Sequence, residues 1–178
     1  MEKDHAILIR RFKLSETSLI VHWCTARAGI IKTVARAACR PKSRFHGKLD
    51  LFFGAEIEYA RSQRSDLHNL RDIALTNPRF AIRESYPRVL AASYFVRLLE
   101  IVCERETPIG EFYDLLERAL TYLEQSDPTR RAILHFESEL ARGLGLPAED
   151  GAAIGALRDL FARVPAQRAE LLGCLEEG

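Results

Sequence analysis

A basic segment without acidic residues is the part of this sequence whose side chains could do chemistry. No Asp or Glu lies between Glu16 and Asp50. Lys and Arg pair with phosphate oxygens, so their concentration favours a polyanionic ligand, most commonly a nucleic acid. A basic face that is merely solvated is the alternative interpretation. The basic residues of the segment are Arg27, Lys32, Arg36, Arg40, Lys42, Arg44 and Lys48.

The positive charge is segregated along the chain rather than abundant. Residues 1–72 hold 14 Lys or Arg and 8 Asp or Glu, whereas residues 73–178 hold 12 and 17, and the whole chain has a net charge of +1. A basic first part and an acidic second part suggest two units with different roles.

Patterns typical of catalysis or metal binding are missing from the sequence. It contains no phosphate-binding glycine loop, no Gly-x-Ser-x-Gly nucleophile motif and no His-Glu-x-x-His motif. The four cysteines are widely spaced and form no Cys-x-x-Cys pair, which argues against a structural zinc site. We therefore expect no enzymatic activity, no cofactor and no metal.

The first part of the chain has the pattern of a small β structure. Alternating or apolar runs punctuated by glycine, proline and polar turns predict five strands. Gly54 lies in the middle of the longest run and suggests a bulge or sharp bend. The count and size fit a five-stranded Greek-key barrel of the OB type, although periodicity alone does not fix the topology. The predicted strands cover residues 6–12, 17–25, 30–36, 49–60 and 66–75.

The second part has helical periodicity. Thr107-Pro108 and Asp127-Pro128 each combine a capping residue with proline, which is typical of a helix start. We expect an α+β protein with a β-barrel domain at residues 1–76 and a helical bundle at residues 77–178. The predicted helices cover residues 87–104, a segment opening at 107–108, a segment from 128 to 144, and residues 151–164 and 166–175.

Three stretches of the sequence carry a family resemblance. They read LSETSLIV at residues 14–21, GIIKTVAR leading on to RPKSR and a glycine within residues 29–47, and FESELARGLGL at residues 136–146. The second stretch is the most specific of the three. Together with the order of parts, these stretches resemble the RecO family of bacterial recombination and repair mediators over roughly residues 5–146.

The resemblance implies a fold and a function. It implies an OB-fold first domain, a helical second domain, binding of single- and double-stranded DNA, and annealing of complementary strands. It also implies action with RecR and single-stranded DNA-binding protein in loading RecA, in the cytoplasm at the nucleoid. The sequence shows no apolar stretch near 20 residues and no signal-peptide pattern, so no membrane role is expected. Many family members carry a four-cysteine zinc-binding insertion after the third stretch, and this chain has none.

Two groups of residues are candidates for binding. The basic strand-and-loop segment and the end of the first strand would contact phosphates, and an aromatic residue within the loop would stack on a base. The helical half would hold the acidic, apolar tail of single-stranded DNA-binding protein, which requires an apolar slot and a cation for the carboxylate. The candidates for DNA are Arg10, Arg11, Lys13, Lys32, Arg36, Arg40, Lys42, Arg44, Phe45 and Lys48, and those for the tail are Arg97, Arg130, Arg131 and Arg142.

Two other functions remain open from the sequence. One is an OB-fold module that binds nucleic acid, including RNA, without annealing strands. The other is a protein-interaction scaffold whose basic face docks an acidic partner and has no affinity for DNA.

Overall fold

The chain divides into a barrel unit and a helical unit. The structure is a computed structural model that describes residues 1–149 and 151–176. The barrel unit consists of residues 1–79 together with 104–113, and the helical unit consists of residues 80–103 together with the chain from Asp114 onward. The domain boundary predicted between residues 76 and 77 stays a prediction.

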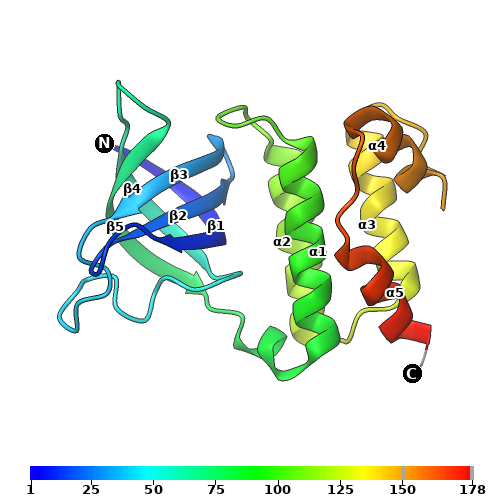
Figure 1. Cartoon of the computed structure of the whole chain (residues 1–178), viewed down its shortest axis with the longest axis horizontal. Helices are drawn as coiled ribbons and strands as arrows, with labels where there is room; N and C mark the ends of the chain where they lie inside the picture. The colour runs from blue at the N-terminus through cyan, green and yellow to red at the C-terminus, as the bar shows by residue number, and fades with distance from the viewer. Residues whose placement is uncertain (150, 177–178) are drawn as a thin grey trace. The chain divides into compact units, whose positions relative to one another are not determined.

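Five strands of the barrel unit close into a barrel (Figure 1). Their order around the barrel is β1-β2-β3-β5-β4, with β3 and β5 parallel and the other neighbouring pairs antiparallel. This is the Greek-key order of an OB-fold, so the predicted fold class is confirmed. The strands are β1 (Glu2–Lys13), β2 (Leu19–Thr25), β3 (Gly29–Ala35), β4 (Gly54–Ala60) and β5 (Leu67–Asn77).

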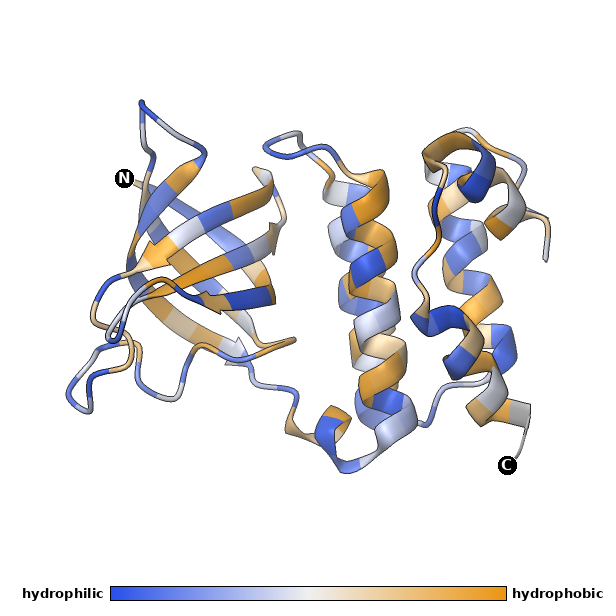
Figure 2. Ribbon diagram, in the orientation of Figure 1, coloured by the Kyte–Doolittle hydropathy of each residue, from blue (hydrophilic) through white to orange (hydrophobic). Residues whose placement is uncertain are grey.

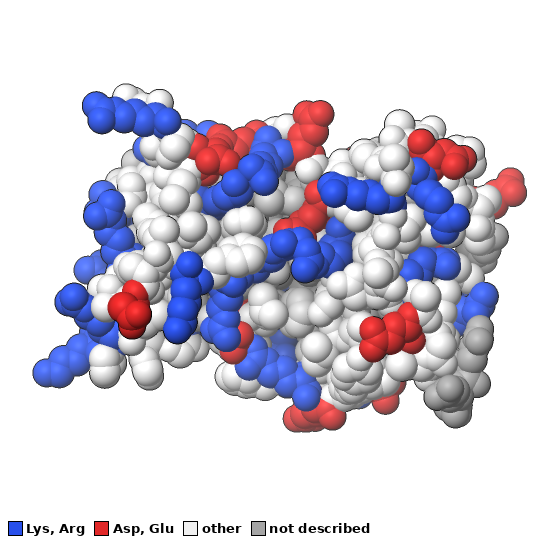
Figure 3. Space-filling model, in the orientation of Figure 1, with Lys and Arg blue, Asp and Glu red and all other residues white. Residues whose placement is uncertain are grey.

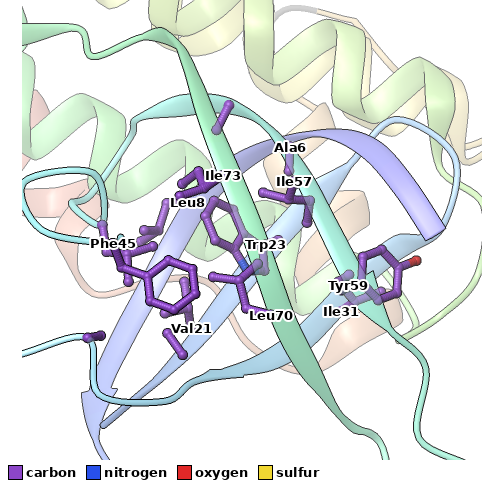
Figure 4. Close-up of a cluster of buried hydrophobic side chains, with 14 residues drawn as sticks. Ala6, Leu8, Val21, Trp23, Ile31, Phe45, Ile57, Tyr59, Leu70 and Ile73 are labelled. Carbon is purple, nitrogen blue, oxygen red and sulfur yellow. The ribbon is translucent and has the colours of Figure 1, made fainter. Parts of the chain in front are cut away.

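Alternation along the strands fills the barrel with apolar side chains. Leu8, Trp23 and Ile31 lie opposite one another on β1, β2 and β3, and each is at most 1% exposed. The Trp23 Nε1 donates a hydrogen bond to Thr33 Oγ1 at 2.9 Å, which satisfies the one polar atom of the indole. Figure 4 shows these side chains converging with others from all five strands.

The predicted strand over residues 49–60 begins only at Gly54. Residues 51–52 form a turn instead, with Phe52 at a φ of +69°. Leu49 and Phe53 are buried, at 6% and 2% exposed, whereas Leu51 is 37% exposed. Phe52 and Phe53 exchange backbone hydrogen bonds with Leu8 of β1 at 2.8 and 2.9 Å, so the β-like pattern reflects burial and local pairing. The turn delays the continuous strand to Gly54, which explains why the prediction was too long.

The helical unit is built around α1. Four consecutive turns of this helix carry buried side chains, among them Tyr94, Phe95 and Leu98, and the Phe95 ring stacks on Phe136 at 4.1 Å between centroids. Orange segments of the α1 ribbon in Figure 2 mark its hydrophobic residues. The helices are η1 (Phe80–Glu84), α1 (Tyr86–Val102), α2 (Gly110–Gln125), α3 (Arg130–Gly143), α4 (Ala153–Phe161) and α5 (Gln167–Glu176).

A buried ion pair joins α5 to the rest of the helical unit. The carboxylate of Glu137 is 1% exposed and accepts hydrogen bonds from Arg168 Nε at 2.7 Å and Nη2 at 3.0 Å. It also accepts one from the Tyr94 hydroxyl at 2.5 Å. The pKa of Tyr94 is raised, first by burial and then by the adjacent carboxylate.

The segment between α1 and α2 belongs to the barrel unit. Glu106 donates its backbone N–H to the Ile30 carbonyl at 3.1 Å, and Arg105 forms a parallel bridge with Ile30. Gly29 has a φ of +76°, and a Cβ added there would lie 2.0 Å from the Thr107 carbonyl oxygen. The backbone therefore approaches β3 at a distance that only glycine permits.

The described residues contain neither a membrane-spanning helix nor a cluster of metal ligands. None of their helices has the length and apolar character required to cross a bilayer. No group of three or more His, Cys, Asp or Glu side chains within residues 1–149 and 151–176 is arranged to hold a metal ion.

Candidate nucleic-acid interface

The connection between β3 and β4, residues 36–53, has one apolar and one cationic side. Ala38, Phe45 and Leu49 point into the core cluster of the barrel. Backbone hydrogen bonds hold the connection in place, for example the one that the Cys39 N–H donates to the Thr17 carbonyl at 3.0 Å. Because the apolar residues anchor the connection, its basic residues face solvent on a fixed backbone.

Four of the predicted phosphate-binding side chains are open to solvent. Each is exposed, and within the described part of the chain none forms a hydrogen bond or an ion pair through its side chain. Figure 3 shows blue side chains projecting from the barrel unit where Figure 1 draws this connection in cyan, at the left of the view. These four, which we call the open cations, are Lys13, Arg36, Arg40 and Lys42.

Two further basic residues bind backbone rather than acidic groups. Arg44 Nη1 donates to the Arg71 carbonyl at 3.1 Å, and Lys48 Nζ donates to the Ile73 carbonyl at 3.2 Å. Both bonds tie the connection to β5. A carbonyl carries no net charge, so both cations still contribute positive potential at this surface.

Two of the predicted residues are paired with carboxylates. Arg11 donates to the Leu49 carbonyl at 2.7 Å and lies 3.3 Å from Asp50 Oδ1. Lys32 Nζ lies 2.8 Å from Asp66 Oδ2, and its side chain is only 19% exposed. These two are less available to an incoming phosphate than the open cations.

The expectation that Phe45 stacks on a base disagrees with its position. Phe45 is 5% exposed, and its ring points into the barrel beside Val21 (Figure 4). The surrounding basic residues made it look accessible, but its backbone lies where the connection turns back over the open end of the barrel. Phe45 therefore anchors the connection and does not present a ring to solvent.

A β-bulge places a second set of side chains on the outer face of the barrel. The pairing of β1 with β2 skips Ile9 between Leu8 and Arg10, so the alternation of β1 changes phase there. Arg10 then lies opposite His22, and His22 lies opposite Lys32, which puts all three on one face. Phe12 follows on the same face, 45% exposed, with its ring centroid 5.3 Å from that of His22.

The charges around His22 are mainly positive. Burial first, and then Lys32, Arg10 and Arg105, lower the pKa of His22 to about 4, while Asp66 acts in the opposite direction. His22 is therefore neutral at physiological pH. Phe12, His22 and Arg105 cannot be recognised as a group from the sequence, because only the bulge and the return of residues 104–113 bring them together.

The helical unit contains an apolar cavity with cations at its rim. Its volume is about 480 Å³. Of the four arginines predicted for partner binding, only Arg131 lines it; Arg97 pairs with Glu100 at 4.0 Å and Arg142 pairs with Glu139. The lining residues are Phe95, Leu115, Arg118, Ala119, Tyr122, Thr129, Arg131, Ala132, His135 and Phe136.

Comparisons with known proteins agree across both units. Residues 1–79 match the family model described as "Recombination protein O N terminal", and residues 83–162 match "Recombination protein O C terminal".

Individual relatives give the same result. "DNA repair protein RecO" of Syntrophus aciditrophicus is 30% identical over 135 residues, which are 76% of this chain and 52% of that protein. The protein of the same name from Rhodopirellula baltica is 29% identical over 140 residues, 79% of this chain and 52% of that protein. The one from Salinibacter ruber is 26% identical over 157 residues, 87% of this chain and 60% of that protein. The chain thus spans about half the length of the first two.

Proposed function

The chain belongs to the RecO family, and from this membership we propose that it acts in recombinational DNA repair as a mediator that binds DNA and anneals complementary strands. The curated relatives are DNA repair proteins. The observation in this chain that carries the proposal is the set of open cations on a fixed backbone beside an OB-fold barrel. We infer no catalytic step.

Affinity for DNA would come mainly from release of counterions. Each Lys or Arg that contacts a phosphate displaces condensed cations, and the entropy of their release favours binding. If the four open cations each neutralise one phosphate of a single strand, log affinity should fall against log salt with a slope of about −3. Phosphate contacts carry no base sequence, which suits a factor that acts at any gap or break.

Annealing requires two polyanionic strands to approach one another. Their mutual repulsion falls when protein cations replace part of the phosphate charge, and complementary bases then pair. The bases must remain accessible during this process. A surface that holds strands by phosphates, as the open cations would, leaves base edges free to pair.

A charge-reversal experiment tests the DNA-binding site. The variant Arg40→Glu with Lys42→Glu should lose roughly tenfold or more in affinity for a single-stranded oligonucleotide, with the salt slope less negative by about 1.4. Arg158→Glu with Arg163→Glu makes the same change of net charge on exposed residues of the helical unit and serves as the control. Equal affinities and slopes in the two variants would place DNA binding elsewhere, and binding without accelerated pairing of complementary oligonucleotides would contradict annealing.

The proposed partners are RecR and the acidic tail of single-stranded DNA-binding protein, in the pathway that loads RecA. The cavity of the helical unit supports the second of these. Phe95, Leu115 and Phe136 give it an apolar floor, and Arg118 and Arg131 supply guanidinium groups for a carboxylate. A terminal aromatic side chain next to a free carboxylate matches these two features.

A further inference from the structure

Phe12 is an exposed aromatic ring on the face where OB-folds hold single strands. Its side chain is 45% exposed on β1, outward from the barrel because of the bulge at Ile9. The His22 ring supports it from β2 at 5.3 Å, tilted by 59°. The ring is thus fixed on one side by the barrel and accessible on the other.

Cations from three separate parts of the barrel unit surround this ring pair. Arg10 lies on β1, Lys32 on β3, and Arg105 on the segment that returns between α1 and α2. All three lower the pKa of His22, and Asp66 raises it. Asp66 pairs with Lys32 at 2.8 Å and with Arg105 at 3.3 Å. These three side chains together carry a net charge of about +1, because one carboxylate neutralises only one of the two cations.

Exposure alone does not distinguish Phe12. Isolated apolar side chains are common on protein surfaces, and Tyr86 is 60% exposed. The Tyr86 hydroxyl, however, bonds to Glu170, an acidic group that disfavours a nucleic-acid strand. Phe12 combines an exposed ring with neighbouring cations. Proteins that bind single-stranded nucleic acid combine the same two features, an aromatic ring for a base and cations for the phosphates.

We propose that Phe12 stacks on one base of single-stranded nucleic acid while Arg10 and Arg105 bind the flanking phosphates and Lys32, paired with Asp66, adds positive potential. The inference rests on the proposed function and deepens it, since it assigns base contact to the outer face of β1–β3 and phosphate contact to a second set of cations. Bases in a duplex are stacked on one another, so Phe12 discriminates single strands from duplex.

The first experiment compares Phe12→Ala and Phe12→Tyr with wild type. Phe12→Ala should weaken binding of a single-stranded oligonucleotide by about 5- to 150-fold, the range that one stacked base contributes. The salt slope and the duplex affinity should not change, because stacking releases no counterions. Phe12→Tyr should keep most of the affinity, and Leu160→Ala, which removes a 57% exposed side chain of the helical unit, should have no effect.

The outcomes separate this inference from the proposed function. Unchanged single-strand binding by Phe12→Ala would overturn the stacking role while DNA binding by the open cations stands. An equal loss on single strands and duplex, with a smaller salt slope, would also overturn it, because Phe12 would then only support its cationic neighbours. Absence of DNA binding by the wild-type protein would overturn the proposed function itself.

A fluorescent variant gives a second, independent measurement. Trp23 is the only tryptophan and is fully buried, so Phe12→Trp adds one exposed reporter. A single-stranded oligonucleotide should quench the added emission, whereas inorganic polyphosphate, which has charge but no bases, should bind without quenching it. Equal quenching by polyphosphate would contradict stacking.

Discussion

At the scale of one residue, the pKa of His22 responds to the charges on the barrel surface. It lies half-buried between Arg10 and Lys32 on neighbouring strands, and both burial and these cations favour its neutral form. A neutral imidazole carries no positive charge with which to attract a phosphate. It does report on the local potential, because its protonation responds to any anion that arrives.

Binding of a single-stranded oligonucleotide should raise the pKa of His22 from about 4 towards its ordinary value of 6.5. A phosphate between Arg10 and Lys32 offsets their repulsion of the imidazolium, and it attracts the charged form directly. The measurement is a pH titration of the histidine ring resonances by NMR with and without the oligonucleotide. His5, which is exposed near the start of β1, is the internal reference. If the pKa of His22 stays at its original value in the saturated complex, no phosphate binds between Arg10 and Lys32.

Residue types were easier to predict than residue orientation. The concentration of cations between Glu16 and Asp50 was evident from the sequence, and Arg36, Arg40 and Lys42 do face solvent. Which aromatic ring is accessible was not evident. Phe45 is buried because it closes one end of the barrel. Phe12 is exposed because it follows a bulge in β1, which the local sequence pattern does not predict.

The close approach of residues 104–113 to β3 is the main feature at the scale of elements. It depends on Gly29, where an added Cβ would lie 2.0 Å from the Thr107 carbonyl oxygen. Gly47 also has a positive φ, +70°, but nothing lies within 4 Å of its would-be Cβ. The two glycines therefore separate the cost of backbone strain from the cost of a steric clash.

Gly29→Ala should lower the free energy of unfolding by about 2–4 kcal/mol, since strain and displacement of the 104–113 segment add together. Gly47→Ala should lower it by only about 1 kcal/mol, from strain alone. Urea unfolding of both variants provides the comparison. If the two variants lose similar free energies of unfolding, residues 104–113 accommodate the added methyl group at position 29 without a measurable energetic cost.

Element types were largely predictable, whereas their ends were not. Strand alternation and the Thr107-Pro108 and Asp127-Pro128 pairs indicated five strands followed by helices, which is what the barrel and helical units contain. The residue that caps α3 is Thr129, whose side chain accepts from the Ala132 N–H, and not Asp127, which binds Arg88. The start of β4 was placed too early because a turn at residues 51–52 interrupts the apolar run before the continuous strand begins at Gly54. The sequence placed the start of α2 at residues 107–108, but the helix begins only at Gly110, because the preceding residues bind β3.

At the scale of the whole molecule, the two units present two kinds of surface. The barrel unit presents the open cations, which we propose bind nucleic acid, and the helical unit has an apolar cavity whose lining includes Arg118 and Arg131. Composition predicted that the two parts of the chain differ, and their separate roles stay a prediction. It did not identify Arg118 or the cavity, because both depend on how α1, α2 and α3 pack.

The cavity should bind an acidic peptide that ends in a phenylalanine carboxylate. Arg131→Glu should weaken this binding by about tenfold or more, because it replaces a charge-assisted hydrogen bond with repulsion. Arg142→Glu changes the net charge equally at a residue outside the cavity and should have little effect. Fluorescence anisotropy of a labelled peptide measures both, and equal weakening by the two variants would place the peptide elsewhere.

The return of residues 104–113 to the barrel has a consequence for any attempt to dissect the protein. A fragment that stops near residue 79 would lose Glu106, which faces Arg61 and His68, and would leave the Ile30 carbonyl without its donor. It would also lose Arg105 from the outer face of the barrel. The barrel unit, which we propose holds nucleic acid, is therefore discontinuous in sequence. An excised barrel needs residues 104–113 joined to it or added as a separate peptide.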